Sequence, residues 1–197
     1  MKIGVLALQG AFIEHLHVLR KLGVDVVEVR TAAELAGLDG LIIPGGESTT
    51  ILKLARHYHM IIPLQEMAKK GVPVMGTCAG MVLLASKVTE SDMGTLGLMD
   101  IEVRRNASGR QVDSFETELA IPGIGTEPFH AVFIRAPYIE HLGSGIEALA
   151  HLDDGTVVAV RKDNLLALAF HPELGHDDRL HEYFIEMIRN SKKELPK

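Results

Sequence analysis

Two spacings of hydrophobic residues alternate along the first half of the chain. Short, almost uninterrupted apolar runs are typical of strands covered on both faces, and they occupy residues 3–8, 24–29, 40–43 and 72–75. Between them, apolar residues recur every three or four positions, which predicts helices over residues 12–22, 48–55, 61–70 and from residue 81 onward. This alternation predicts a parallel, doubly wound sheet with helices on both faces.

The second half is dominated by strand-like runs joined by short turns. We expect strands at residues 101–104, 110–119, 131–136, 148–152, 156–161 and 165–170, followed by a helix over residues 177–191. Asp153-Asp154-Gly155 is typical of a hairpin turn, so an antiparallel extension is expected, with some strands free to rejoin the main sheet. The predicted fold is a three-layer, doubly wound α/β domain with a mostly parallel sheet and an antiparallel extension, spanning residues 1–197 as a single domain.

The composition narrows the class of partner. A net charge of −6, 5% aromatic residues and no Trp disfavour binding to nucleic acid or to an anionic membrane surface. The apolar runs are too short for a membrane span, and the N-terminal MKIGVLAL leads directly into an expected strand rather than a cleavage site. A single cysteine leaves no internal disulfide and suits a reducing compartment. We therefore expect a cytoplasmic protein.

The stretch Gly76-Thr77-Cys78-Ala79-Gly80 joins an expected buried strand to an expected buried helix. In hydrolases, Gly-x-nucleophile-x-Gly forms a tight strand-to-helix turn that exposes the nucleophile. Both glycines are expected because a side chain at either position would collide with the neighbouring strand or helix. A cysteine at a helix N-terminus is favoured as thiolate over thiol. A lone cysteine in an apolar segment is more often a buried hydrophobic residue, but the paired glycines favour a nucleophile.

A second motif supplies what a cysteine nucleophile needs. His171-Pro172-Glu173 follows the apolar run at residues 165–170, and Pro172 disfavours helical geometry for His171. On an extended segment, residues two apart point to the same side, so Glu173 can hold the His171 imidazole in orientation. Alone, His-Pro-Glu after a strand is more often only a polar turn. Together with Cys78, it predicts His171 as the base and Glu173 as its orienting acid.

The loop of residues 44–48, Pro-Gly-Gly-Glu-Ser, lies between an expected strand and an expected helix, where α/β sheets bind ligands. Gly46 offers an unhindered backbone N–H, which together with the N–H of Ala79 forms a predicted oxyanion hole. Ser48 is expected to cap the following helix. The loop is not a phosphate-binding loop, and no dinucleotide fingerprint follows the first strand, so no cofactor is expected.

Ordinary roles are expected for the other histidines and for three arginines. We expect surface or capping positions, and no metal site, for His15, His17, His57, His59, His176 and His181. Solvated charges, or partners for a substrate carboxylate, are expected of Arg104, Arg105 and Arg135.

These motifs resemble the class I glutamine amidotransferases, whose glutaminase domains use a Cys-His-Glu triad. Gly-Thr-Cys-Ala-Gly and His-Pro-Glu match the two signatures of that family, and the resemblance spans essentially the whole chain. Within the family, residues 4–10, 44–48 and 104–106 are similar to the glutaminases that serve pyridoxal 5′-phosphate (vitamin B6) synthesis. Ser108 departs from the pattern, which has Phe or Tyr beside Arg105.

The resemblance implies an activity, a site and a partner. It implies hydrolysis of L-glutamine to glutamate and ammonia through a γ-glutamyl thioester on Cys78, with His171 relaying protons and Glu173 orienting His171. Ammonia would pass to a separate (β/α)₈-barrel pyridoxal 5′-phosphate synthase subunit, with Gln9 and Gly10 close to that coupling. The substrate-binding residues that it implies are Gly46, Glu47, Ser48, Arg105, Ile134 and Arg135.

Two other classes of protein stay open. One is a DJ-1/PfpI-like cysteine hydrolase or chaperone, but in such proteins the histidine follows the cysteine closely, whereas Met81 follows Gly80 here and His171 lies far downstream. The other is a non-enzymatic glutamine-binding regulator with an idle site. Such a site commonly loses one member of its triad, and here Cys78, His171 and Glu173 are all present.

Overall fold

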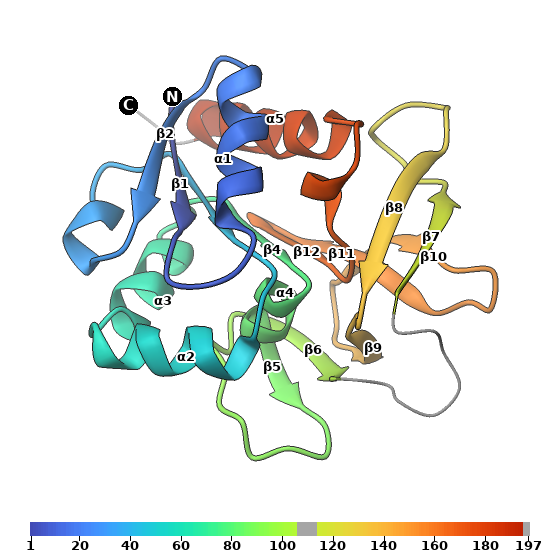
Figure 1. Cartoon of the computed structure of the whole chain (residues 1–197), viewed down its shortest axis with the longest axis horizontal. Coiled ribbons are helices and arrows are strands. Elements are labelled where there is room, and N and C mark those ends of the chain that lie inside the picture. Colours follow the sequence, from blue (N-terminus) through green and yellow to red (C-terminus); the bar gives the residue numbers. More distant parts are fainter. Residues whose placement is uncertain (106–113, 195–197) are drawn as a thin grey trace.

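Parallel strands from both halves of the chain form the central sheet of the computed structural model, which describes residues 1–105 and 114–194 (Figure 1). The parallel strands are β1 (Lys2–Leu6), β2 (Asp25–Val29), β3 (Gly40–Ile43), β4 (Val74–Thr77) and β12 (Leu165–Leu168). Antiparallel β11 (Val157–Lys162) and then β10 (Glu147–His151) extend it, in the order β10-β11-β12-β4-β3-β1-β2. The predicted mostly parallel sheet with an antiparallel extension is confirmed, and β12 is the late strand that rejoins it.

Helices cover both faces of this sheet. α1 (Phe12–Lys21) and α5 (Arg179–Glu194) lie on one face, and α2 (Ser48–His57), α3 (Ile61–Lys69) and α4 (Ala79–Leu84) lie on the other (Figure 1). Short 3₁₀ turns follow β2 and β12, at η1 (Ala32–Leu35) and η2 (Pro172–Leu174). The predicted three-layer arrangement is therefore confirmed. None of the helices within residues 1–105 and 114–194 has the length and apolar character that a membrane crossing requires.

Outside the main sheet, the second half forms two smaller sheets. One joins β5 (Ala85–Val88), β6 (Met99–Arg104) and β9 (Tyr138–Leu142), and the other joins β7 (Ser114–Leu119) and β8 (Phe129–Ile134). The hairpin turn predicted at residues 153–155 lies between β10 and β11. There the Leu152 N–H donates to the Thr156 carbonyl at 2.9 Å, and Gly155 has a φ of +86°. This prediction is confirmed.

Two elements differ from the sequence-based expectation. The helix expected from residue 81 onward ends at Leu84, and the chain enters β5, which pairs with β6. β9 was not predicted, because its Tyr-Ile-Glu-His-Leu sequence mixes polar and apolar side chains and is held as a strand by pairing with β6. Of the strand expected at residues 110–119, the part before residue 114 lies outside the described residues.

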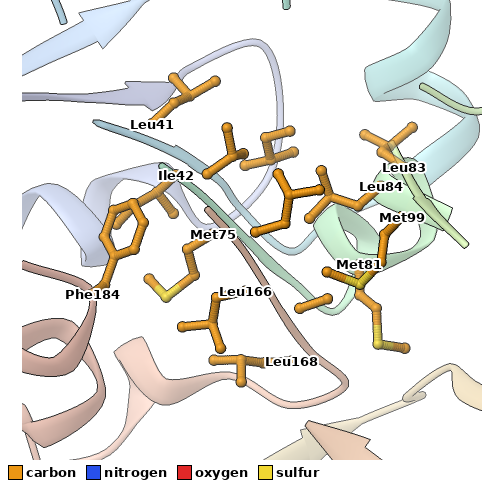
Figure 2. Close-up of a cluster of buried hydrophobic side chains, with 14 of the residues drawn as sticks. Leu41, Ile42, Met75, Met81, Leu83, Leu84, Met99, Leu166, Leu168 and Phe184 are labelled. Atoms are coloured by element: carbon orange, nitrogen blue, oxygen red, sulfur yellow. The ribbon is translucent and has the colours of Figure 1, made fainter. Parts of the chain in front are cut away.

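Buried side chains from both halves of the chain pack on the two faces of the central strands. Figure 2 shows Phe184 of α5 beside Met75 of β4, with Leu84 of α4 on the other side of the strands. All three side chains are fully buried. A Cβ on Gly40 of β3 would press against the side chain of Ile188 in α5, so this helix packs directly on the strand. Within the described residues, one continuous hydrophobic cluster runs from β1 to α5, and the single domain over residues 1–197 stays a prediction.

The sheet brings the predicted functional segments to one edge. Because β1, β3, β4 and β12 are parallel, the segments that follow their carboxyl ends meet there. Those segments contain Gln9, Gly46, Cys78 and His171. The two motifs that are far apart in sequence therefore lie side by side, because β12 pairs with β4.

Candidate active site

Cys78 lies at a strained turn between β4 and α4. Its backbone has φ 48° and ψ −104°, a conformation that costs a non-glycine residue about 1–3 kcal/mol. The flanking glycines make the turn possible. A Cβ on Gly76 would lie 2.6 Å from the backbone of Gly80, and a Cβ on Gly80 would collide with the carbonyl of Ile43 in β3. The predicted close approach at both glycines is confirmed.

His171 and Glu173 are in contact, but on a tighter backbone than expected. The Nδ1 atom of His171 lies 2.6 Å from Oε1 of Glu173. Pro172 begins η2, so the chain turns after His171 instead of staying extended, while His171 itself keeps a non-helical φ of −109° and ψ of 88°. The predicted extended geometry through Glu173 is therefore wrong. The predicted contact forms nevertheless, because a single 3₁₀ turn also brings the carboxylate back to the imidazole.

The charges of this pair follow from their neighbours. Burial lowers the pKa of His171, but hydrogen bonding to Cys78 and to Glu173 outweighs burial and raises this pKa to about 10. Burial raises the pKa of Glu173, but His15 and His171 outweigh it and lower this pKa below its ordinary value. At neutral pH the pair is therefore an imidazolium and a carboxylate. A positive charge beside Sγ is what a cysteine nucleophile needs in order to react as thiolate.

A cavity of about 390 Å³ opens in front of Cys78. It is lined by every predicted site residue except two. Glu173 is buried behind His171, and Gly10 lies beneath the backbone of Gly45 and Gly46. Lining residues that the sequence reasoning did not single out are Ala11, Gly45, Val82, Pro137 and Leu174. The structure thus brings the predicted site together around one space.

Gly45 is the closest of these additional residues to the reactive groups. A Cβ at this position would collide with the ring of His171, lying 2.9 Å from Nδ1 and 3.3 Å from the Cβ of Cys78. Only glycine therefore lets the loop approach this closely. The requirement could not be derived from Pro-Gly-Gly in the sequence, because it depends on β3, β4 and β12 being neighbours.

The loop of residues 44–48 is tied to the segment between β1 and α1. The Ala11 N–H donates to the Gly45 carbonyl at 3.0 Å, and the Glu47 N–H donates to Oε1 of Gln9 at 2.8 Å. Because the C=O and N–H of a trans peptide point in opposite directions, the first bond directs the Gly46 N–H away from Ala11. The start of α1 thus sets the orientation of a predicted oxyanion-hole donor.

Glu47, and not Ser48, caps α2, so the predicted cap is corrected. The Glu47 carboxylate accepts from the N–H groups of Thr49 and Thr50 at 3.3 and 2.7 Å, and its Oε1 lies 3.3 Å from Nη2 of Arg105. Burial raises the pKa of Glu47, but the bonds from Thr49 and Thr50 outweigh it and lower this pKa to about 2. Ser48 is the first helical residue and is buried, with its Oγ 3.6 Å from Sδ of Met93.

The end of β8 supplies the opposite wall of the cavity. The carbonyl of Ile134 accepts from the Cys78 thiol at 3.9 Å. Arg135 follows with a φ of +42° and an exposed side chain at the cavity. Arg104 turns away to form ion pairs with Glu90 and Glu140. Ser108, expected beside Arg105, lies outside the described residues, as does Asn106.

Two histidines expected at surface or capping positions are fully buried behind the site. His15 of α1 and His181 of α5 are both 0% exposed, so that expectation is wrong for them. His15 Nε2 lies 3.3 Å from Oε2 of Glu173. Helical spacing was the available signal, because His15 shares a face with Leu19 and His181 shares one with Phe184. Within residues 1–105 and 114–194, no group of His, Cys, Asp and Glu side chains is arranged to hold a metal ion.

Comparisons with known proteins agree with this geometry. Residues 5–190 match the SNO glutamine amidotransferase family. The chain is 58% identical to "Pyridoxal 5'-phosphate synthase subunit PdxT" of Dehalococcoides mccartyi strain BAV1, covering 98% of this chain and 100% of the relative. It is 60% identical to the protein of the same name from Moorella thermoacetica, covering 95% of this chain and 100% of the relative.

Solved structures place the fold in the same group. A crystal structure of a glutamine amidotransferase superposes with a TM-score of 0.90 at 47% identity, covering 95% of this chain and 98% of that one. A putative GMP synthase protein from Thermoplasma acidophilum shares the fold, with a TM-score of 0.72 at 20% identity, covering 98% of this chain and 96% of that one. On the full-length match and the identity of its relatives, this chain belongs to the SNO glutamine amidotransferase family.

Proposed function

We propose that this chain is the glutaminase subunit of a pyridoxal 5′-phosphate synthase. In this role it hydrolyses L-glutamine to glutamate and ammonia and delivers the ammonia to a separate synthase subunit. The observation that carries the proposal is the joining of Cys78, His171 and Glu173 at one cavity in a chain of the glutamine amidotransferase family. The relatives named as synthase subunits support the destination of the ammonia.

The first half of the reaction uses Cys78 as nucleophile. Its Sγ attacks the carbon of the side-chain amide of glutamine, and the C=O π electrons move to the oxygen, which the N–H groups of Gly46 and Ala79 stabilise. When this intermediate collapses, the C–N bond breaks and the His171 imidazolium gives its proton to the departing nitrogen. Ammonia leaves, and a γ-glutamyl thioester remains on Cys78.

The second half regenerates the enzyme. The now neutral His171 takes a proton from water as the water oxygen attacks the thioester carbon. The C–S bond then breaks, which restores the Sγ nucleophile beside the His171 imidazolium and releases glutamic acid, whose γ-carboxyl proton passes to solvent to give glutamate. Glu173 keeps its negative charge throughout and holds the Nδ1 side of the ring, so that the other ring nitrogen serves the reaction.

The cavity also carries charges suited to the α-amino acid end of glutamine. Arg105 and Arg135 both line it and match a substrate carboxylate. The Glu47 carboxylate is already engaged by the start of α2 and by Arg105, which supports a role in holding Arg105 in place. Gly46, Ser48 and Ile134 complete the proposed substrate site.

The proposed partner is a (β/α)₈-barrel synthase subunit, and the proposed point of coupling is Gln9 and Gly10. The contacts of Gln9 with Glu47 and of Ala11 with Gly45 support this, because a partner that presses on residues 9–11 would move the loop carrying Gly46. A glutaminase that depends on this movement would turn over slowly without the synthase. A cytoplasmic location is proposed from the single cysteine, which suits a reducing compartment.

The test is release of ammonia from L-glutamine, measured for the chain alone and in the presence of the synthase. We expect slow release alone, a marked rise with the synthase, and loss of release in both settings for Cys78→Ala. Comparable turnover with and without the synthase would contradict the proposed coupling. Glutamine binding without ammonia release in either setting would instead identify a non-enzymatic regulator.

A further inference from the structure

A row of buried polar side chains continues behind Glu173, away from the cavity. Oε1 of Glu173 faces His171, and Oε2 faces Nε2 of His15 at 3.3 Å. The same Nε2 lies 3.2 Å from Oγ1 of Thr77, and Nδ1 of His15 lies 2.9 Å from Nε2 of His181. The row thus connects α1, β4, η2 and α5, and all of these residues are buried.

Both added histidines are neutral. Burial lowers the pKa of His15, against the opposing attraction of Glu173. Burial, together with neighbouring His15, lowers the pKa of His181 to about 3. The titratable groups around His15 are Glu173, His171, His181 and Glu14, and the Glu173 carboxylate is the charged group in contact with its ring.

The carboxylate selects one arrangement of protons along the row. An ionised carboxylate attracts an N–H and repels a lone pair, so the proton of His15 is favoured on Nε2, the ring nitrogen that lies 3.3 Å from Oε2 and 3.2 Å from the Thr77 hydroxyl. A neutral ring then has a free lone pair on Nδ1, which accepts from the Nε2–H of His181. This arrangement leaves only a lone pair on Nδ1 of His181, the atom that has no hydrogen-bond partner among the described residues. In the opposite arrangement, a lone pair on Nε2 of His15 would face the buried carboxylate, and an N–H on Nδ1 of His181 would have no partner. Both effects would destabilise the folded protein.

We propose that His15 is a positioning residue for Glu173, and that His181 sets the proton arrangement of His15. The proposal rests on the proposed glutaminase function, because it assigns His15 a role in the triad of that reaction. The close contact of the His15 Nε2–H with Oε2, at 3.3 Å, opposes rotation of the carboxylate and leaves Oε1 aimed at Nδ1 of His171. Oε2 forms no hydrogen bond among the described residues, so the attraction of the nearby His15 Nε2–H is what compensates the burial of this oxygen.

The role follows from the cost of a buried charge. Without the nearby Nε2–H of His15, the buried charge on Oε2 would lose the dipole that compensates it, which favours the protonated acid and raises the pKa of Glu173. A protonated Glu173 no longer stabilises the His171 imidazolium. As the pH falls, the reactivity of Cys78 that depends on this imidazolium would then be lost at a higher pH than in the wild-type protein.

A matched pair of substitutions separates this role from packing. In His15→Gln the side-chain NH₂ reaches the place of Nε2 and keeps a donor toward Glu173, whereas in His15→Asn the NH₂ reaches only the place of Nδ1. His181→Leu removes the donor to His15 while filling the space. His17→Gln is the control, because His17 is exposed on the same helix. Thermal unfolding of each variant checks that it is folded.

The first readout is the rate of alkylation by iodoacetamide as a function of pH. Cys78 is the only cysteine of the chain, so alkylation reports this thiol alone and needs neither glutamine nor a synthase. We expect the acid limb of the profile to move to higher pH by about one unit in His15→Asn and His181→Leu. His15→Gln and His17→Gln are expected to keep the wild-type profile.

The second readout is glutamine turnover with the synthase subunit present. We expect kcat to fall about ten- to a hundred-fold in His15→Asn, the effect of leaving a buried charged oxygen without its close N–H, with KM little changed. Equal behaviour of His15→Gln and His15→Asn, or an unmoved alkylation profile in both, would overturn the proposal. A moved alkylation profile in His15→Asn, combined with a wild-type protein that does not turn over glutamine even with the synthase, would uphold the positioning role and refute the glutaminase function instead.

Discussion

Oε1 of Glu47 lies 3.3 Å from Nη2 of Arg105, which joins the loop before α2 to the end of β6 across the mouth of the cavity. The Glu47 carboxylate is held by N–H groups of the first turn of α2, so it anchors the guanidinium of Arg105. An anchored guanidinium can bind a carboxylate with little loss of side-chain entropy. This relationship links helix capping to the proposed recognition of glutamine.

We predict that Arg105→Met weakens glutamine binding. Removal of the guanidinium takes away a charged partner for the substrate carboxylate, so KM for glutamine should rise about tenfold while kcat changes little. The measurement is steady-state glutaminase kinetics with the synthase subunit present. The control is Arg104→Met, because the neighbouring Arg104 bonds Glu90 and Glu140 and does not line the cavity. An equal rise in KM for both variants would contradict the prediction.

Glu47 should also make folding stability depend on pH. Its pKa falls from an ordinary 4.5 to about 2 on folding. The stabilisation that its charge contributes is therefore fully present above pH 4.5 and is lost as the pH falls toward 2. The side chain is 47% exposed, so solvent screening limits the effect, and we expect Glu47→Gln to lower the free energy of unfolding at pH 7 by about 1 kcal/mol.

Urea unfolding at pH 7 and at pH 3.5 checks this prediction. The difference in free energy of unfolding between wild type and Glu47→Gln should be smaller at the lower pH. Glu66→Ala serves as the control, since Glu66 is exposed in α3 and makes no cap. If this difference in free energy of unfolding grew on acidification, the predicted stabilisation by the Glu47 charge would be contradicted.

Gly45→Ala should abolish catalysis while leaving the fold in place. The added Cβ would collide with the His171 ring and displace it from Cys78, so we expect kcat to fall at least about a hundred-fold. The matched control is Gly175→Ala, where the added Cβ would have no neighbour closer than 3.7 Å. Glutamine turnover and thermal unfolding of the two variants are the measurements. Retention of turnover in Gly45→Ala would mean that catalysis does not require the His171 ring at the position it has in this structure.

Gln9 should transmit the effect of the synthase. Its Oε1 accepts from the Glu47 N–H, and Gln9→Met removes this acceptor at similar side-chain length, whereas Gln9→Glu keeps it. We expect Gln9→Met to lose most of the stimulation of turnover by the synthase and Gln9→Glu to retain it. The quantity to compare is the ratio of turnover with and without the synthase. The same ratio in Gln9→Met as in wild type would remove Gln9 from the proposed coupling.

Local backbone constraints explain which parts of the site could be predicted. Gly76 and Gly80 are required by contacts within a few residues of Cys78 or with the adjacent strand, so the pattern itself implies the turn. Pro172 restricts His171 whatever surrounds it. The cap of α2 was misassigned because Ser48 and Glu47 are adjacent and the backbone geometry decides which one precedes the helix.

The sequence by itself determined the alternation of strands and helices, the strained cysteine turn and the His-Pro-Glu pair, because each depends on hydrophobic spacing or on glycine and proline geometry. Only the tertiary structure decided that β12 lies beside β4, which puts His171 next to Cys78. It also decided that β9 is a strand and that His15 and His181 are buried behind Glu173. The physical reason is that pairing, close approach and burial arise between segments distant along the chain, and no local pattern records which segments will meet.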